Sequence, residues 1–158
     1  MSGHSSPILR ALGAAVVGAL AFGLGGALAI LAWAVVTLGP PLGVPSAHDL
    51  RGFLRLGLSL GLQVGTPGAF TLGLVTHAGL QRLRWTTWPV YAAAGALLGL
   101  VGAAIFVGAG GFDFHRRADG SDYALWGLIG AFAGLCGGCA FWLVGRPGAQ
   151  ASSPTPIS

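Results

Sequence analysis

Four long stretches of this chain contain no charged side chain, and they limit the possible folds more than any motif does. The stretches are residues 11–38, 56–76, 85–112 and 123–145. A helix rises about 1.5 Å per residue, so about 20 apolar residues cross the hydrocarbon core of a bilayer. We therefore predict an all-α fold, an integral membrane four-helix bundle with short loops. The predicted spans are residues 11–38, 56–79, 88–110 and 123–145.

The composition agrees with a chain that lies almost wholly in a membrane. Charged residues make up 8% of its 158 residues, compared with about a quarter in soluble proteins. The spans leave only short connections and tails, so we predict one transmembrane domain and no soluble catalytic domain. The net charge of +4 comes from arginines near the span ends, where cations meet water and anionic headgroups. The predicted partners are the lipid bilayer and either other membrane proteins or a second copy of the chain, with no nucleic acid.

An even number of spans places both termini on one side of the membrane, and the arginines favour the cytoplasmic side. Arg10 precedes the first span, and the loop between the second and third spans contains Arg82 and Arg84 but no acidic residue. The apolar run of the first span continues to Leu38, beyond the h-region of a signal peptide, so we predict an uncleaved helix. The tail at residues 147–158 is small, polar and proline-containing, and we predict that it is disordered.

Each span carries a row of small residues four positions apart, which allows two helix backbones to approach closely in lipid. The rows are Ala11, Ala15, Ala19, Gly23 and Ala27 in the first span, Gly57, Gly61, Gly65, Ala69 and Gly73 in the second, Gly95, Gly99 and Ala103 in the third, and Gly130, Gly134 and Gly138 in the fourth. Packing within one bundle is the simpler interpretation. The alternative is that one row, on the fourth span, forms a dimer interface.

The second span combines polar side chains with a proline. Gln63 and Thr66 lie at apolar depth, and Pro67 stands between Gly65 and Gly68. A proline inside a helix removes one backbone hydrogen bond and is expected to produce a kink. The freed carbonyls make Gln63, Thr66 and Pro67 candidates for a ligand site, because transporters place such sites at broken helices. A kink without a ligand is the simpler interpretation.

The two ends of the second span each allow two interpretations. Residues 50–62 either begin the span or lie partly in the interface, with Arg51 and Arg55 reaching the headgroups and the chain re-entering afterwards. His77, near the other end, is either a proton or ligand site or an interfacial residue bonded to a backbone carbonyl or a headgroup. We favour a full crossing and an interfacial histidine.

Cys136 and Cys139 are the most motif-like pair in the chain. Residues three apart share one face of a helix, so the two sulfurs could meet one metal ion or one disulfide partner. Membrane thiol-redox enzymes related to vitamin K epoxide reductase also carry a Cys-x-x-Cys pair in a four-helix bundle. Those enzymes use a second cysteine pair, whereas this chain has no other cysteine. Cysteine also behaves as a small apolar residue, and we favour packing as the role of both.

No other pattern indicates a cofactor, a metal or a catalytic centre. The loop at residues 110–122 contains Asp113, His115, Asp119 and Asp122, but Arg116 and Arg117 oppose cation binding there. The chain has no phosphate-binding loop, dinucleotide fingerprint, zinc-protease motif or serine-nucleophile elbow. We predict that it is not an enzyme and binds no metal or cofactor.

Several short motifs resemble those of small, uncharacterised four-span inner-membrane proteins of proteobacteria. They are the run at residues 67–70, His77 with Arg82 and Arg84, the run at residues 91–96, and Phe141 and Trp142 before Gly145 and Arg146. The resemblance covers most of the chain from the second span onward. It implies a bacterial inner (cytoplasmic) membrane location and no particular activity.

Three functions remain open at this point. We predict a structural or accessory membrane protein that acts through protein or lipid contacts. The first alternative is a minimal channel or carrier for a small solute, built around the kinked second span. The second alternative is thiol redox or metal handling at Cys136 and Cys139.

Overall fold

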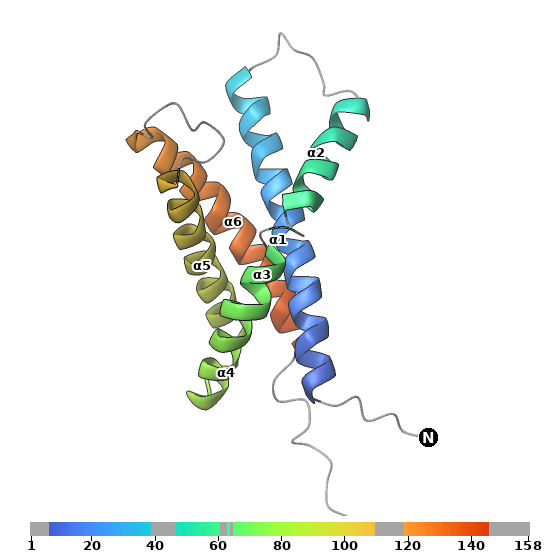
Figure 1. Ribbon diagram of the computed structural model, residues 1–158, viewed down its shortest axis with the longest axis vertical. Coiled ribbons are helices and arrows are strands. Elements are labelled where there is room, and N and C mark those ends of the chain that lie inside the picture. The colour runs from blue at the N-terminus through green and yellow to red at the C-terminus, as the bar shows by residue number, and fades with distance from the viewer. Residues whose placement is uncertain (1–6, 39–46, 61–62, 64, 110–118, 146–158) are drawn as a thin grey trace, which may run out of the picture.

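The computed structural model describes residues 7–38, 47–60, 63, 65–109 and 119–145, and every secondary-structure element among them is helical. The elements are α1 (Pro7–Leu38), α2 (Ala47–Leu60), α3 (Thr66–Gly68), the π-helix η3 (Ala69–Gly73), α4 (Leu74–Arg82), α5 (Trp88–Gly108) and α6 (Gly120–Gly145). Figure 1 shows their order along the chain. The predicted all-α class is confirmed for these residues.

In the part of the chain that the structure describes, three helices are long and apolar enough to cross a membrane. They are α1 over Ile8–Val36, α5 over Trp88–Gly108 and α6 over Gly120–Gly145. These helices correspond to the first, third and fourth predicted spans. The uncharged stretches therefore predicted their positions well, because an apolar segment without charges has only intrahelical partners for its backbone in lipid.

The second predicted span differs, because no single helix covers residues 56–79. α2 begins at Ala47 and ends at Leu60, so its 14 residues rise only about 21 Å. Pro67 lies in the first turn of α3, where its missing N–H group leaves no helical hydrogen bond unmade. Gln63 and Gly65, just before it, are also helical, so the helical path is irregular around Pro67. The π-helix η3 follows, and the Thr71 hydroxyl donates to the Pro67 carbonyl oxygen at 2.6 Å.

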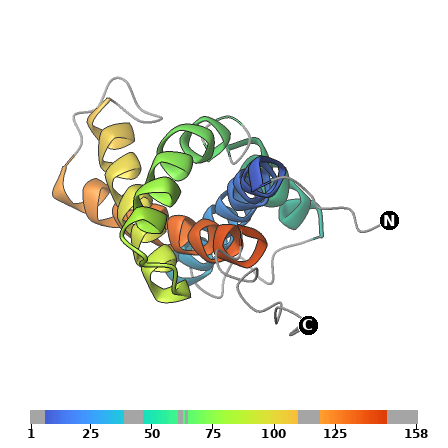
Figure 2. The ribbon, with the colours of Figure 1, turned by 90° about the horizontal axis from the view of Figure 1, so that it is seen from below.

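α6 is the central helix of the molecule, with α5 on one side and α1 on the other (Figure 2). A Cβ atom added at Gly99 would collide with the Gly130 carbonyl, and one added at Gly138 would collide with the Tyr91 carbonyl. The glycine rows of the third and fourth predicted spans therefore face each other within one chain. The fourth-span row is covered by α5 and does not form an outer face for a dimer.

The small-residue row of α1 receives the second segment of the chain. A Cβ added at Gly57 of α2 would lie 2.9 Å from the Gly23 carbonyl oxygen and 3.2 Å from the Ala27 Cα. The opposite face of α2 carries Arg51, Arg55 and Ser59, all exposed. α2 is thus an amphipathic helix whose apolar face lies on α1, while the segment from α3 to α4 crosses towards the start of α5 (Figure 1).

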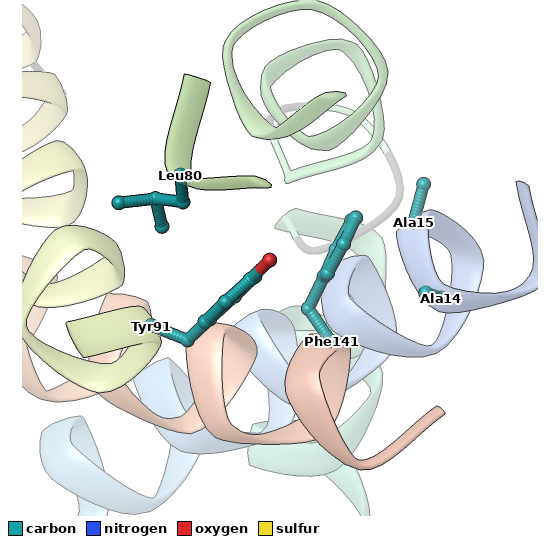
Figure 3. Packing of buried hydrophobic residues seen from close by; sticks show 5 residues of the cluster. All are labelled: Ala14, Ala15, Leu80, Tyr91 and Phe141. Carbon is teal, nitrogen blue, oxygen red and sulfur yellow. The ribbon is translucent and has the colours of Figure 1, made fainter. Parts of the chain in front are cut away.

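A small core closes the end of the molecule where α4 is joined to α5. It consists of Ala14, Ala15, Leu80, Tyr91 and Phe141. Figure 3 shows Tyr91 and Phe141 between the two alanines of α1 and Leu80 of α4.

The α4–α5 turn at this end is held by a hydrogen bond from α6. The Trp142 indole N–H donates to the Thr86 carbonyl oxygen at 2.8 Å. Arg84 adopts a left-handed conformation, with φ of 59°, as the chain turns sharply after α4. The arginine-bearing loop of the sequence is therefore a tight, fixed turn. The cluster at residues 113–117 and the tail at residues 147–158 lie outside the described residues.

Candidate functional site: a glycine-lined cleft

A cavity of about 330 Å³ lies between α1, the segment from α3 to α4, α5 and α6. Each helix contributes one stripe of residues at helical spacing. The α5 stripe is Tyr91, Ala94, Gly95, Leu98, Gly99, Gly102, Ala103 and Phe106, and the α6 stripe is Trp126, Ile129, Gly130, Ala133, Gly134, Gly137, Gly138 and Phe141. A volume of this size falls in the usual range of small-ligand sites.

The cavity is a long cleft, because each stripe follows its helix over several turns. From Tyr91 to Phe106 the α5 stripe extends about 22 Å at 1.5 Å per residue. Glycines dominate the middle of the cleft, and two of them, Gly68 and Gly102, have open space where a side chain would stand. The cleft stays open because these positions carry no side chain to fill it.

Aromatic rings mark both ends of the cleft. Phe106 of α5 and Trp126 of α6 pack edge to face at one end, with ring centroids 5.9 Å apart. At the other end the His77 ring lies 5.2 Å from that of Phe141 and 5.7 Å from that of Tyr91. Among the described lining residues, the polar side chains Thr76, His77 and Tyr91 lie at the second end, and we call this the polar end of the cleft.

The polar end is built on a hydrogen-bonded chain of three side chains. His77 Nδ1 lies 2.7 Å from the Tyr91 hydroxyl, and His77 Nε2 lies 3.0 Å from Gln81 Nε2. When the Gln81 amide donates to Nε2, the proton of neutral His77 sits on Nδ1 and is donated to the Tyr91 oxygen. Both ring nitrogens of His77 are then occupied. Tyr91, at 5% exposure, keeps its own hydroxyl proton for another acceptor.

The predicted candidates of the second span face away from this cleft. Gln63 is exposed and donates to the Ser59 hydroxyl oxygen at 3.2 Å, and Pro67 is exposed as well. Thr66 is half-buried, and none of the three lines the cleft. The opposite face of the same segment lines it instead, through Gly65, Gly68, Ala69, Leu72, Gly73, Thr76 and His77. The structure therefore separates His77 from the other candidates.

His77 has different partners from those that its position in the sequence indicated. Its two nitrogens bond to side chains of α4 and α5, where we had expected a backbone carbonyl or a headgroup. The pairing of His77 with Tyr91 was not predicted, because the two residues belong to different predicted spans. The tight turn between the two residues was the available signal, since it makes α4 and α5 neighbours.

The two cysteines lie apart from the cleft lining. A Cβ added at Gly25 of α1 would lie 3.0 Å from both the Cβ and the Sγ of Cys136. Cys136 therefore fills the space that Gly25 leaves between α1 and α6. Cys136 and Cys139 are partly buried and form no disulfide. Within the described part of the chain, no three His, Cys, Asp or Glu side chains gather closely enough to hold a metal ion.

In comparisons with known proteins, no family model, no curated protein and no solved structure matched this chain. The resemblance to small four-span inner-membrane proteins therefore stays a prediction.

Proposed function

We propose that this chain is an accessory protein of the bacterial inner membrane that holds an acyl chain of a membrane lipid in its central cleft. It crosses the bilayer four times, and the broken segment from α2 to α4 makes the second crossing. Both termini face the cytoplasm. The protein works through this lipid contact and through contacts with other membrane proteins, without a catalytic centre or cofactor.

The course of the second segment supports a fourth crossing. α2 begins at the end of the molecule where α1 ends, and α4 ends beside the start of α5 (Figure 1). α2 rises about 21 Å, and the residues from Thr66 to Arg82 add about 25 Å. Together they exceed the roughly 30 Å of a hydrocarbon core, even with a bend between them.

The orientation rests on the arginines at the end where α4 meets α5. Arg82 and Arg84 are exposed there, and Arg10 lies near the start of α1 at the same end. Exposed Trp85 and Trp88 flank the turn, as expected of a helix end at headgroup level.

The observation that carries the lipid-binding proposal is the shape and lining of the cleft. Its described lining is long, apolar over most of its length, and polar near His77 and Tyr91. An apolar wall cannot replace the water around an ion or a polar solute, whereas it suits a hydrocarbon chain. Gln63 and Thr66 stand outside the cleft, which weakens the carrier alternative. Cys136 is used in helix packing, which weakens the thiol alternative.

Filling the cleft tests the proposal. Gly68→Leu and Gly102→Leu place a side chain in open space within the lining. Protein purified in mild detergent should carry bound lipid in native mass spectrometry, and both variants should lose most of it. Gly13→Leu is the matched control, because Gly13 also has open space around it but lies outside the lining. Equal lipid retention by all three variants would rule out the cleft as the lipid site.

A further inference from the structure

We propose that the polar end of the cleft binds the ester carbonyl oxygen of the lipid, with Tyr91 as the donor and His77 as the residue that positions it. This inference rests on the proposed function of the cleft. It adds the chemical group by which the bound chain is recognised.

The direction of the hydrogen-bonded chain follows from the Gln81 amide nitrogen, which can only donate. When it donates to His77 Nε2, neutral His77 donates from Nδ1 to the Tyr91 oxygen, and the Tyr91 hydroxyl proton remains available. The Tyr91 hydroxyl makes no other hydrogen bond to the described residues. A nearly buried hydroxyl whose proton has no partner is stabilised by a hydrogen-bond acceptor. A carbonyl oxygen is a suitable acceptor, because it has no proton of its own that would need a partner.

Thr76 supplies a second hydroxyl at the same end. It lines the cleft one residue before His77 and makes no hydrogen bond through its side chain to the described residues. A carbonyl oxygen has two lone pairs and can accept from both hydroxyls. The two donors lie on facing helices, α4 and α5, so a single oxygen between them would join these helices.

The described lining of the cleft disfavours charged groups at this end. Among the described residues, no Arg, Asp, Glu or Lys lines the cleft, and His77 has both nitrogens engaged. A carboxylate or an ammonium group held there would lack a counter-charge and lose its hydration. The polar end therefore suits an uncharged oxygen.

The depth of the polar end matches the position of an ester group in a lipid. His77 lies one turn before Gln81, where α4 approaches its end and Arg82 follows. The headgroup of a bound lipid would then lie near Arg82 and Arg84, and its acyl chain would extend along the cleft towards Trp126. Uncharged carbonyl oxygens lie between these two parts of an ester lipid.

An ester and ether pair of equal chain length tests the inference. Monoacylglycerol carries the carbonyl, whereas the alkylglycerol ether lacks only that oxygen, and both are uncharged. Binding to the purified full chain in nanodiscs is measured by competition with a photoreactive monoacylglycerol. We expect the ester to bind about 2- to 10-fold more tightly than the ether, as one hydrogen bond allows. Tyr91→Phe should remove this preference while leaving ether binding unchanged.

The ratio of ester to ether affinity separates loss of carbonyl recognition from a folding defect, because a folding defect would weaken the binding of both ligands alike. Thr76→Val should lower the ratio in part, and it is the second variant should Tyr91→Phe fold poorly. His77→Leu should lower it too, because Tyr91 then loses the group that orients its hydroxyl.

Two results overturn the inference, and they differ from the failure of the cleft itself. Equal binding of ester and ether to the unmodified protein, with both blocked by Gly102→Leu, leaves the cleft as a lipid site and eliminates carbonyl recognition. Tighter binding of a fatty acid anion than of the ester eliminates it as well. If Gly102→Leu blocks neither ligand, the proposed function fails together with the inference.

Discussion

The pair formed by α5 and α6 and the broken segment from α2 to α4 use glycine in opposite ways. Between α5 and α6, glycine faces glycine, and an added Cβ at Gly99 or Gly134 would enter a backbone group of the other helix. In the broken segment, Gly52, Gly68 and Gly79 meet nothing within 4 Å. The same residue type therefore closes one interface and leaves space open in the other.

The difference shows that a glycine row brings helices together only when the partner also presents small residues. Gly95 and Gly99 meet the row at Gly130 and Gly134, so the two backbones touch along several turns. In lipid such close packing is the main source of helix association. Among the described glycines of the broken segment, Gly57 and Gly65 approach α1. One face of the stretch from Gly65 to His77 borders the cleft.

The largest loss of stability is expected from a large residue inside the α5–α6 interface. Gly99→Leu should lower the free energy of unfolding by more than about 3 kcal/mol, above the usual range for overpacking, because a backbone carbonyl cannot rotate away. Gly102→Leu, one turn along the same helix, has open space and should change it by less than about 1 kcal/mol. Reversible unfolding in mixed detergent and dodecyl sulfate measures both. Similar losses of unfolding free energy in the two variants would contradict the close contact of α5 and α6 at Gly99.

An intermediate decrease in the free energy of unfolding is expected where the broken segment contacts α1. A Cβ at Gly57 would collide with the Ala27 side chain, so Gly57→Leu should cost about 1–3 kcal/mol. The cost should stay below that of Gly99→Leu, because α2 is short and can move outward. Gly52→Leu on the exposed side of α2 is the control and should be nearly neutral. A cost for Gly57→Leu as large as that of Gly99→Leu would mean that the two regions are equally fixed.

The smallest decrease in the free energy of unfolding should follow from removal of the hydrogen bond between Thr71 of η3 and the Pro67 carbonyl. Thr71→Val keeps the side-chain shape and removes the bond to the Pro67 carbonyl. Thr71 is exposed, so the cost should be near the lower limit of about 0.5 kcal/mol for one hydrogen bond. Thr71→Ser keeps the hydroxyl and should restore the stability. Faster hydrogen exchange across residues 69–73 in the valine variant alone would locate the change.

The broken segment is also where interpretation of the sequence was least complete. The uncharged stretches predicted α1, α5 and α6, because length and apolarity are local properties that lipid selects directly. Pro67, with Gly65 and Gly68 on either side, correctly indicated a region of irregular helix. Whether the proline kinks a helix or begins one depends on where the preceding helix ends, which no residue near Pro67 specifies.

The candidate site was harder to predict than the helices. Gln63 and Thr66 are polar residues in an apolar segment, yet neither lines the cleft. The residues that form its polar end, His77 and Tyr91, belong to different helices and meet only after the turn between α4 and α5 is formed. A sequence pattern identifies polar residues, but it does not show which face of a helix is turned towards the cleft.

The sequence alone thus determined the helical class, the three long apolar helices and the small-residue rows, since each depends on residues within one helix. Only the tertiary structure decided which row meets which, that α6 is central, and that a long cleft remains beside it. The reason is physical. In lipid, the backbone N–H and C=O groups form their hydrogen bonds within each helix, whereas the cleft and its polar end depend on how far apart four separate helices lie. Their spacing is set by pairs of small residues such as Gly99 and Gly130, which are distant in the chain and adjacent only in the fold.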